Sequence, residues 1–130
     1  MSHPGYGFGR TVTAGYAEVV GSVREALKQE GFGIITEIDV AATMKEKLDR
    51  DVAPYVILGA CNPGYAHQVL EADPELGLFL PCSVVVYETA DGTRVSAVDP
   101  EAMLGLSGNK DLAAIATEVK VCLQRAIDRF

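Results

Sequence analysis

Residues 78–99 read LFLPCSVVVYETADGTRVSAVD, in which two runs rich in β-branched residues flank the tripeptide Ala90-Asp91-Gly92. A short loop containing Asp-Gly between two such runs is a strong hairpin signal, because these residues accept the backbone angles of a tight turn. The stretch therefore predicts two consecutive strands that pair antiparallel. A sheet whose strands are all joined by crossover helices would contain no such hairpin.

Outside the hairpin, apolar residues recur with a period of two or of about 3.6, which predicts strands and helices respectively. Strands are expected at residues 6–12, 32–40 and 54–61, helices at 16–31, after Asp39 and at 63–73, and a final helix carries an apolar stripe from Leu112 to Ile127. This order favours an α+β two-layer sandwich, with helices packed on a mixed, largely antiparallel sheet. A doubly wound parallel sheet is the alternative.

The size and charge of the chain narrow the class of protein. Its 130 residues, 48% of them apolar, fit one domain over residues 1–130. The 18 acidic side chains outnumber 11 basic ones, and the net charge is -7. Because an acidic chain repels phosphate, neither nucleic acid nor an anionic membrane is expected as a partner. With no signal-peptide pattern and no apolar run long enough to cross a bilayer, we expect a cytoplasmic protein.

Three cysteines, Cys61, Cys82 and Cys122, are spread along the chain with no Cys-x-x-Cys pair. An odd number favours reduced thiols over a disulfide framework, and the spacing argues against a thioredoxin-type centre or a zinc ribbon. Cys122 falls on the apolar stripe of the final helix, so we assign it to packing.

Residues 57–67, ILGACNPGYAH, place a thiol at a strand end and an imidazole six residues later. Asn62 is a good N-cap and Pro63 suits the first helical position, so Cys61 comes just before a helix N-terminus. The partial positive charge there favours a thiolate. His67, one turn into the same helix, could approach Cys61. The alternative is that Cys61 is a small buried side chain and Asn-Pro-Gly serves backbone geometry.

Cys82 shares a strand face with Leu80, Val84 and Val86, which points it toward the core. If the strands that carry the cysteines are neighbours, Cys61, Cys82 and His67 would supply two sulfurs and one imidazole. Such a set suits copper, as Cu(I), or zinc, as Zn(II). The alternative is two separate core cysteines.

Glu37 and Asp39 alternate on one face of the strand at 32–40. Paired carboxylates could serve acid–base chemistry or bind a hard cation, which makes Glu37 a candidate ligand-binding residue together with Cys61, Asn62 and His67. The alternative gives Asp39 to the cap of the following helix and leaves Glu37 solvated or paired with Lys45 or Lys47.

Most of the chain is similar to the bacterial and archaeal family of domains of unknown function numbered 302. The pattern GFG-TEID, K-KL, Y-ILGACNP-AH, LPC-VVVYE and DP carries the resemblance. The matching residues are Glu37, Asp39, Cys61, Asn62, Pro63, His67, Pro81 and Cys82. The resemblance implies a curved antiparallel sheet with helices on one face, of the topology called TATA-binding-protein-like, and a homodimer. It implies no established activity.

Three functions therefore compete. The first is a small-ligand or soft-metal-binding protein that uses Cys61, Cys82 and His67. The second is a non-catalytic homodimeric interaction module. The third is a thiol-dependent enzyme with Cys61 as nucleophile and His67 as base. No Gly-x-Ser-x-Gly elbow, Walker loop or His-Glu-x-x-His helix is present to favour a common hydrolase or nucleotide enzyme.

Overall fold

The hairpin in the sequence forms the centre of the structure. The computed structural model describes residues 5–130. Strands β4 (Cys82–Thr89) and β5 (Gly92–Val98) pair antiparallel, with Thr89 opposite Gly92 at the turn. Gly92 has a φ of 141°, and a Cβ there would lie 2.1 Å from the carbonyl oxygen of Val12. Only glycine fits this turn, because the backbone angle and the close approach both exclude a side chain.

Three further strands extend the sheet: β1 (Gly7–Val12), β2 (Gly33–Asp39) and β3 (Tyr55–Cys61). The five strands lie in the order β1-β5-β4-β3-β2, and every neighbouring pair is antiparallel. The predicted α+β class is confirmed, and the doubly wound parallel sheet is wrong. The sheet, predicted as mixed and largely antiparallel, is antiparallel at all four of its strand pairs.

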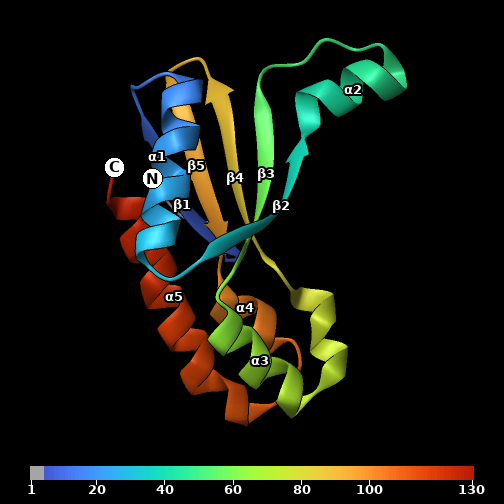
Figure 1. Ribbon diagram of the computed structural model, residues 1–130, viewed down its shortest axis with the longest axis vertical. Helices are drawn as coiled ribbons and strands as arrows, with labels where there is room; N and C mark the ends of the chain where they lie inside the picture. The colour runs from blue at the N-terminus through green and yellow to red at the C-terminus, as the bar shows by residue number, and fades with distance from the viewer. Residues whose placement is uncertain (1–4) are drawn as a thin grey trace.

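Helices α1 (Tyr16–Gln29) and α5 (Ala113–Asp128) cover one face of the sheet (Figure 1). Alternate strand residues point at these helices and are buried, as the strand period requires. The main core contains Val23, Leu27, Leu58, Val84, Val86, Val95 and Leu123, each at most 1% exposed. Burial between the sheet and these two helices accounts for the apolar periods of two and about 3.6 residues in the sequence.

A smaller lobe lies beyond one end of the sheet (Figure 1). It comprises α3 (Pro63–Ala72), the 3-10 helix η1 (Pro74–Phe79), α4 (Pro100–Gly105), the 3-10 helix η2 (Lys110–Leu112) and the start of α5. Its own core contains Val69, Leu76, Leu104, Leu112 and Ala116. This lobe lies against the strand ends that carry Cys61 and Cys82. No helix of residues 5–130 is both long enough and apolar enough to cross a membrane.

Three local predictions need correction. The strand expected from residue 78 begins only at Cys82, because Pro74–Phe79 form η1, which Asp73 caps. Helix α4 was not expected, although Asp99 and Pro100 are good starting residues for it. In β2, predicted as one regular strand, a register shift between Ile34 and Thr36 interrupts the alternation of faces.

Helix α2 (Val40–Leu48) projects from the other end of the sheet, apart from α1 and α5 (Figure 1). It starts where predicted, since the Asp39 carboxylate accepts a hydrogen bond from the Ala42 N–H at 2.9 Å. None of its residues is buried. In this respect α2 differs from α1 and α5, which each bury a stripe.

Candidate functional site

Cys61 and Cys82 lie at the same end of two neighbouring strands. β3 ends at Cys61, β4 begins at Cys82, and Ala60 is the direct partner of Cys82 in the antiparallel register. Cys61 is therefore one residue beyond the position opposite Cys82. The strands that carry Cys61 and Cys82 are therefore neighbours, as a site with both sulfurs requires.

A small cavity of about 40 Å³ lies beside both cysteines. Its lining is mostly apolar and comes from the sheet, α3, η1, α4 and α5: Phe32, Ala60, Cys61, Asn62, Tyr65, Ala66, Val69, Phe79, Leu80, Cys82, Pro100, Leu104 and Val119. A water molecule needs roughly 10–15 Å³ of such space, so the cavity has room for only a few small atoms. Typical small-molecule pockets, at roughly 300–1,000 Å³, are far larger.

The Cys82 thiol is protonated at neutral pH. Burial, together with the nearby Cys61, raises the pKa of Cys82 to about 11. Both causes disfavour the anion, because a buried thiolate loses solvation and is repelled by a second one. Cys82 is therefore a poor nucleophile, and a metal ion would have to displace its proton.

Asn62 is the N-cap of α3, as predicted. Its Oδ1 accepts hydrogen bonds from the backbone N–H groups of Gly64 at 3.1 Å and Tyr65 at 3.4 Å. Its side-chain nitrogen lies 2.9 Å from the place where a Cβ on Gly31 would stand. The residue thus has a local structural role, whether or not the cavity binds a ligand.

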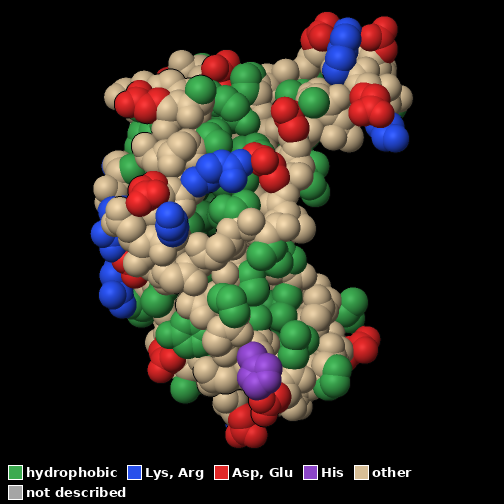
Figure 2. Space-filling model, in the orientation of Figure 1, with side chains coloured by type: hydrophobic (Ala, Val, Ile, Leu, Met, Phe, Trp, Pro, Cys, Tyr) green, Lys and Arg blue, Asp and Glu red, His purple; other side chains and the backbone are tan. Residues whose placement is uncertain are grey.

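His67 faces away from the cavity. Its side chain is 74% exposed, and its Nε2 lies 3.0 Å from the Glu71 carboxylate, one turn along α3. Figure 2 shows histidine-coloured atoms at the surface of the smaller lobe. Within residues 5–130 no three His, Cys, Asp or Glu side chains are placed to hold one metal ion. The predicted set of Cys61, Cys82 and His67 is therefore not assembled, because the i,i+4 pair with Glu71 turns the imidazole outward.

The outward position of His67 also argues against the thiol-dependent enzyme with Cys61 as nucleophile. No hydrogen bond joins Cys61 to His67 in the described part of the chain, where the imidazole contacts Glu71. A general base must lie within hydrogen-bond reach of its nucleophile, directly or through one water.

Glu37 lies on β2 and forms an ion pair with Arg24 of α1. The predicted lysine partners are wrong, since Lys45 pairs with Asp49 at 2.9 Å and with Asp51 at 3.4 Å. Glu37 is not among the residues that line the cavity of Cys61 and Cys82. The ion pair links Glu37 on the edge strand β2 to the helix layer.

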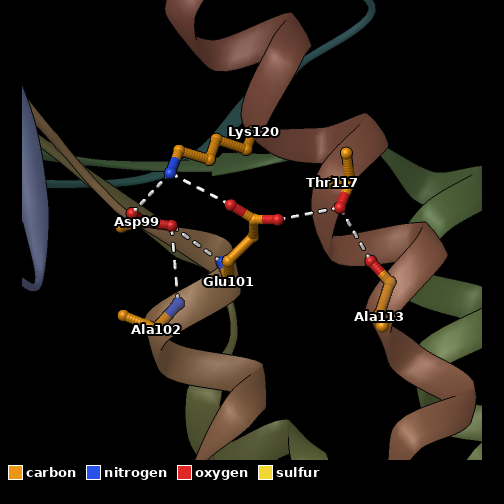
Figure 3. A network of polar contacts seen from close by, with 6 residues as sticks. All are labelled: Asp99, Glu101, Ala102, Ala113, Thr117 and Lys120. Carbon is orange, nitrogen blue, oxygen red and sulfur yellow. Dashed lines mark hydrogen bonds and ion pairs between the residues drawn. The ribbon is translucent and has the colours of Figure 1, made fainter.

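A polar network that no sequence motif indicated joins α4 to α5 (Figure 3). Lys120 lies 2.9 Å from Asp99 and 3.0 Å from Glu101, and the Thr117 hydroxyl donates to Glu101 at 2.8 Å. The hydrogen bond from Thr117 and the contact with Lys120 lower the pKa of Glu101. Asp99 and Glu101 raise the pKa of Lys120. The network holds α4 against α5, beside the wall of the cysteine cavity.

A second candidate region is the sheet face opposite α1 and α5, which we call the open face. It contains a hollow of about 720 Å³ whose lining includes Thr11, Tyr55, Val85, Tyr87 and Ser96. The rings of Tyr55 and Tyr87 stack at 5.0 Å with planes 7° apart. A sequence signal existed, because VVVY and YVIL are apolar at consecutive positions, which indicates strands with apolar surroundings on both faces.

A family model described as a domain of unknown function, DUF302, matches residues 8–130. The chain belongs to the DUF302 family. The crystal structure of an uncharacterized conserved DUF302 protein from Bacillus stearothermophilus superposes with a TM-score of 0.90 at 32% identity. That comparison covers 97% of this chain and 98% of the Bacillus chain. Among curated proteins none matches. These matches confirm the family resemblance seen in the sequence. Neither of them names an activity.

Proposed function

We propose that this DUF302 domain is a non-catalytic interaction module that forms a homodimer through its open face. The observation that carries the proposal is the uncovered hollow of that face, about 720 Å³, in which Tyr55, Val85 and Tyr87 lie among polar neighbours such as Thr11, Arg94 and Ser96. Apolar residues stand on both sides of β3 and β4, and α1 and α5 cover only one side. Apolar side chains left exposed together on one face of a sheet favour association with a partner.

Several features support a second copy as the partner. The exposed apolar residues Ile38 at 49%, Leu48 at 63% and Val52 at 48% lie on β2, on α2 and in the following loop, beside this face. An interface formed by twofold symmetry uses the same patch twice, so the patch needs only to complement itself. The family resemblance points the same way.

Sedimentation velocity on the wild type and on Val85→Lys tests this function. Val85 lines the hollow, so a charge there is expected to turn a dimer into a monomer. Val121→Lys is the matched control, because Val121 lies on α5 and is 42% exposed. Circular dichroism checks that both variants fold. A monomeric wild type, or a dimer that resists Val85→Lys, contradicts the proposal.

The second candidate function is binding of Cu(I) between Cys61 and Cys82. The specific observation in its favour is that both cysteines border one small, mostly apolar cavity. Thiolates are soft ligands that suit Cu(I) and can bind it in pairs, whereas Zn(II) usually takes four ligands. Because Cys82 must lose its proton, affinity is expected to rise with pH.

Titration of Cu(I) against a chromogenic chelator, under reducing conditions, tests this second function. One Cu(I) per chain is expected for the wild type and for Cys122→Ser, and none for Cys61→Ser or Cys82→Ser. Cys122 is a suitable control because it is a free, half-buried cysteine that does not line the cavity. Binding that survives both cavity substitutions, or no binding at all, contradicts it.

A further inference from the structure

The smaller lobe contains a second and larger pocket, formed by α4, η2 and the start of α5. This outer pocket has a volume of about 350 Å³, against about 40 Å³ for the cavity beside the cysteines. Its volume lies within the range of small-molecule pockets, roughly 300–1,000 Å³. Its apolar wall consists of Leu104, Leu112 and Ala116. A molecule that fills the outer pocket is therefore too large for the cysteine cavity.

The two spaces are neighbours on the same two helices. Within residues 5–130, Leu104 of α4 is the one residue that lines both of them. At the start of α4, Pro100 lines the cavity and Glu101 lines the outer pocket. On α5, Val119 lines the cavity, and Ala116, one turn earlier, lines the outer pocket. The cavity and the pocket therefore lie along successive turns of α4 and α5, with Leu104 at their boundary.

The side chain of Leu104 is packed on both sides. It is 7% exposed and belongs to one apolar cluster with Val69, from the cavity wall, and with Leu112 and Ala116, from the wall of the outer pocket. Because buried side chains fill the space between their neighbours, the Leu104 side chain separates the cavity from the pocket. Its removal would leave a void between them, since the surrounding structure collapses only in part.

The polar network of α4 and α5 holds Leu104 in this place. Lys120 of α5 lies 2.9 Å from Asp99 and 3.0 Å from Glu101, so it contacts both residues that flank Pro100 (Figure 3). The Asp99 carboxylate also accepts a hydrogen bond from the Glu101 N–H at 2.9 Å, which caps α4. Helices shorter than about 12–15 residues are marginal on their own, and α4 has six residues. The position of α4 therefore depends on these contacts with α5.

We infer that Leu104 determines the size of the ligand that the cysteine cavity accepts, because it separates the cavity from the outer pocket. With Leu104 in place, the space beside Cys61 and Cys82 admits a single ion or a few small atoms. Without its side chain the two spaces join, and a molecule with a bulky apolar group reaches Cys82 through the outer pocket. This inference rests on the second candidate function and names the residue that limits its site to an ion.

The test compares the rates at which methyl and benzyl methanethiosulfonate modify Cys82. Both reagents react in the same way: the thiolate attacks the sulfenyl sulfur, a disulfide forms and methanesulfinate leaves. They differ in the size of the transferred group. The measurement uses a Cys61→Ser background, in which Cys82 is the remaining cysteine of the cavity lining, so no neighbouring thiol exchanges with its adduct. Mass spectrometry of peptides gives separate rates for Cys82 and Cys122.

Leu104→Ala is expected to raise the rate of Cys82 with the benzyl reagent at least tenfold more than the rate with the methyl reagent. Leu112→Ala is the matched control, because Leu112 is 1% exposed, belongs to the same cluster and lines the outer pocket without lining the cavity. It should leave the ratio of the two rates unchanged. Leu104→Val removes one methylene and is expected to change the ratio in the same direction, which keeps the test available if Leu104→Ala does not fold.

Cys122 reports on unfolding, because it does not line the cavity and loss of the whole fold would expose both cysteines together. A rise at Cys82 that Cys122 matches would overturn the inference. An unchanged ratio in both Leu104 variants, or an equal change in Leu112→Ala, would overturn it too. The Cu(I) titration fails or succeeds separately, since the thiosulfonates need no metal. Absence of Cu(I) binding, together with a ratio that depends on Leu104, would remove the metal function and leave the size limit standing.

Discussion

Two neighbouring side chains crowd Gly59 in β3. A Cβ there would lie 2.0 Å from the Thr36 Oγ1 and 2.7 Å from a Pro81 ring carbon. We expect Gly59→Ala to lower the free energy of unfolding by about 1–3 kcal/mol, because both neighbours must move. Urea denaturation measures the change. Gly105→Ala is the control, since a Cβ at Gly105 meets nothing within 4 Å. Equal losses at the two positions would contradict the prediction.

The raised pKa of Cys82 has a direct chemical consequence. At pH 8 a thiol with a pKa of about 11 is roughly 0.1% thiolate, against about 10% for the ordinary value of 9.0. Alkylation of Cys82 by iodoacetamide is therefore expected to be at least 100-fold slower than that of a free thiol, as followed by mass spectrometry of the intact chain and its peptides. Cys61→Ser should speed it, because Cys61 contributes to the shift. Modification of Cys82 at the rate of a free thiol would show this prediction to be wrong.

At the scale of elements, the network of Asp99, Glu101, Thr117 and Lys120 joins α4 to α5 and makes stability depend on pH. The folded-state pKa of Glu101 is lowered, so its contribution is present above the unfolded value of about 4.5 and is lost as the pH falls through the folded value. That of Lys120 is raised, so its contribution is present below about 10.5 and is lost at higher pH.

Glu101→Gln is expected to reduce the loss of stability between pH 6 and pH 3, because the variant has no carboxylate to protonate. Urea unfolding across that range measures the loss. Glu46→Gln, on α2, is the control and should retain the wild-type dependence on pH. An unchanged acid dependence in Glu101→Gln would mean that the ion pair with Lys120 contributes nothing measurable.

At the scale of the whole molecule, the proposed homodimer would couple folding to concentration. A dimer that dissociates when it unfolds gains stability by mass action, so its Tm rises with protein concentration. Calorimetry over a 100-fold range of concentration is expected to show this rise for the wild type. Val85→Lys, in the lining of the hollow, should show a smaller rise over the same range. A constant Tm for the wild type would argue against the dimer.

Local rules predicted much of this molecule from sequence. The Asp-Gly hairpin, the caps at Asp39 and Asn62, and the apolar stripe of α5 all follow from residues within a few positions of one another. These signals act through backbone angles and hydrogen bonds between near neighbours. They can therefore be recognised without knowing how the rest of the chain folds. Together they were enough to predict the fold class.

Only the tertiary structure decided which distant residues meet. The sheet order brought Cys61 beside Cys82 and Glu37 to Arg24, while His67 turned outward to Glu71. It also left α2 and one sheet face, which carries Tyr55, Val85 and Tyr87 among polar residues, uncovered by other helices. Such outcomes depend on strand register and on competition between partners far apart in sequence. Because a one-residue change of register exchanges the two faces of a strand, short-range patterns determine the elements, and long-range packing determines the site.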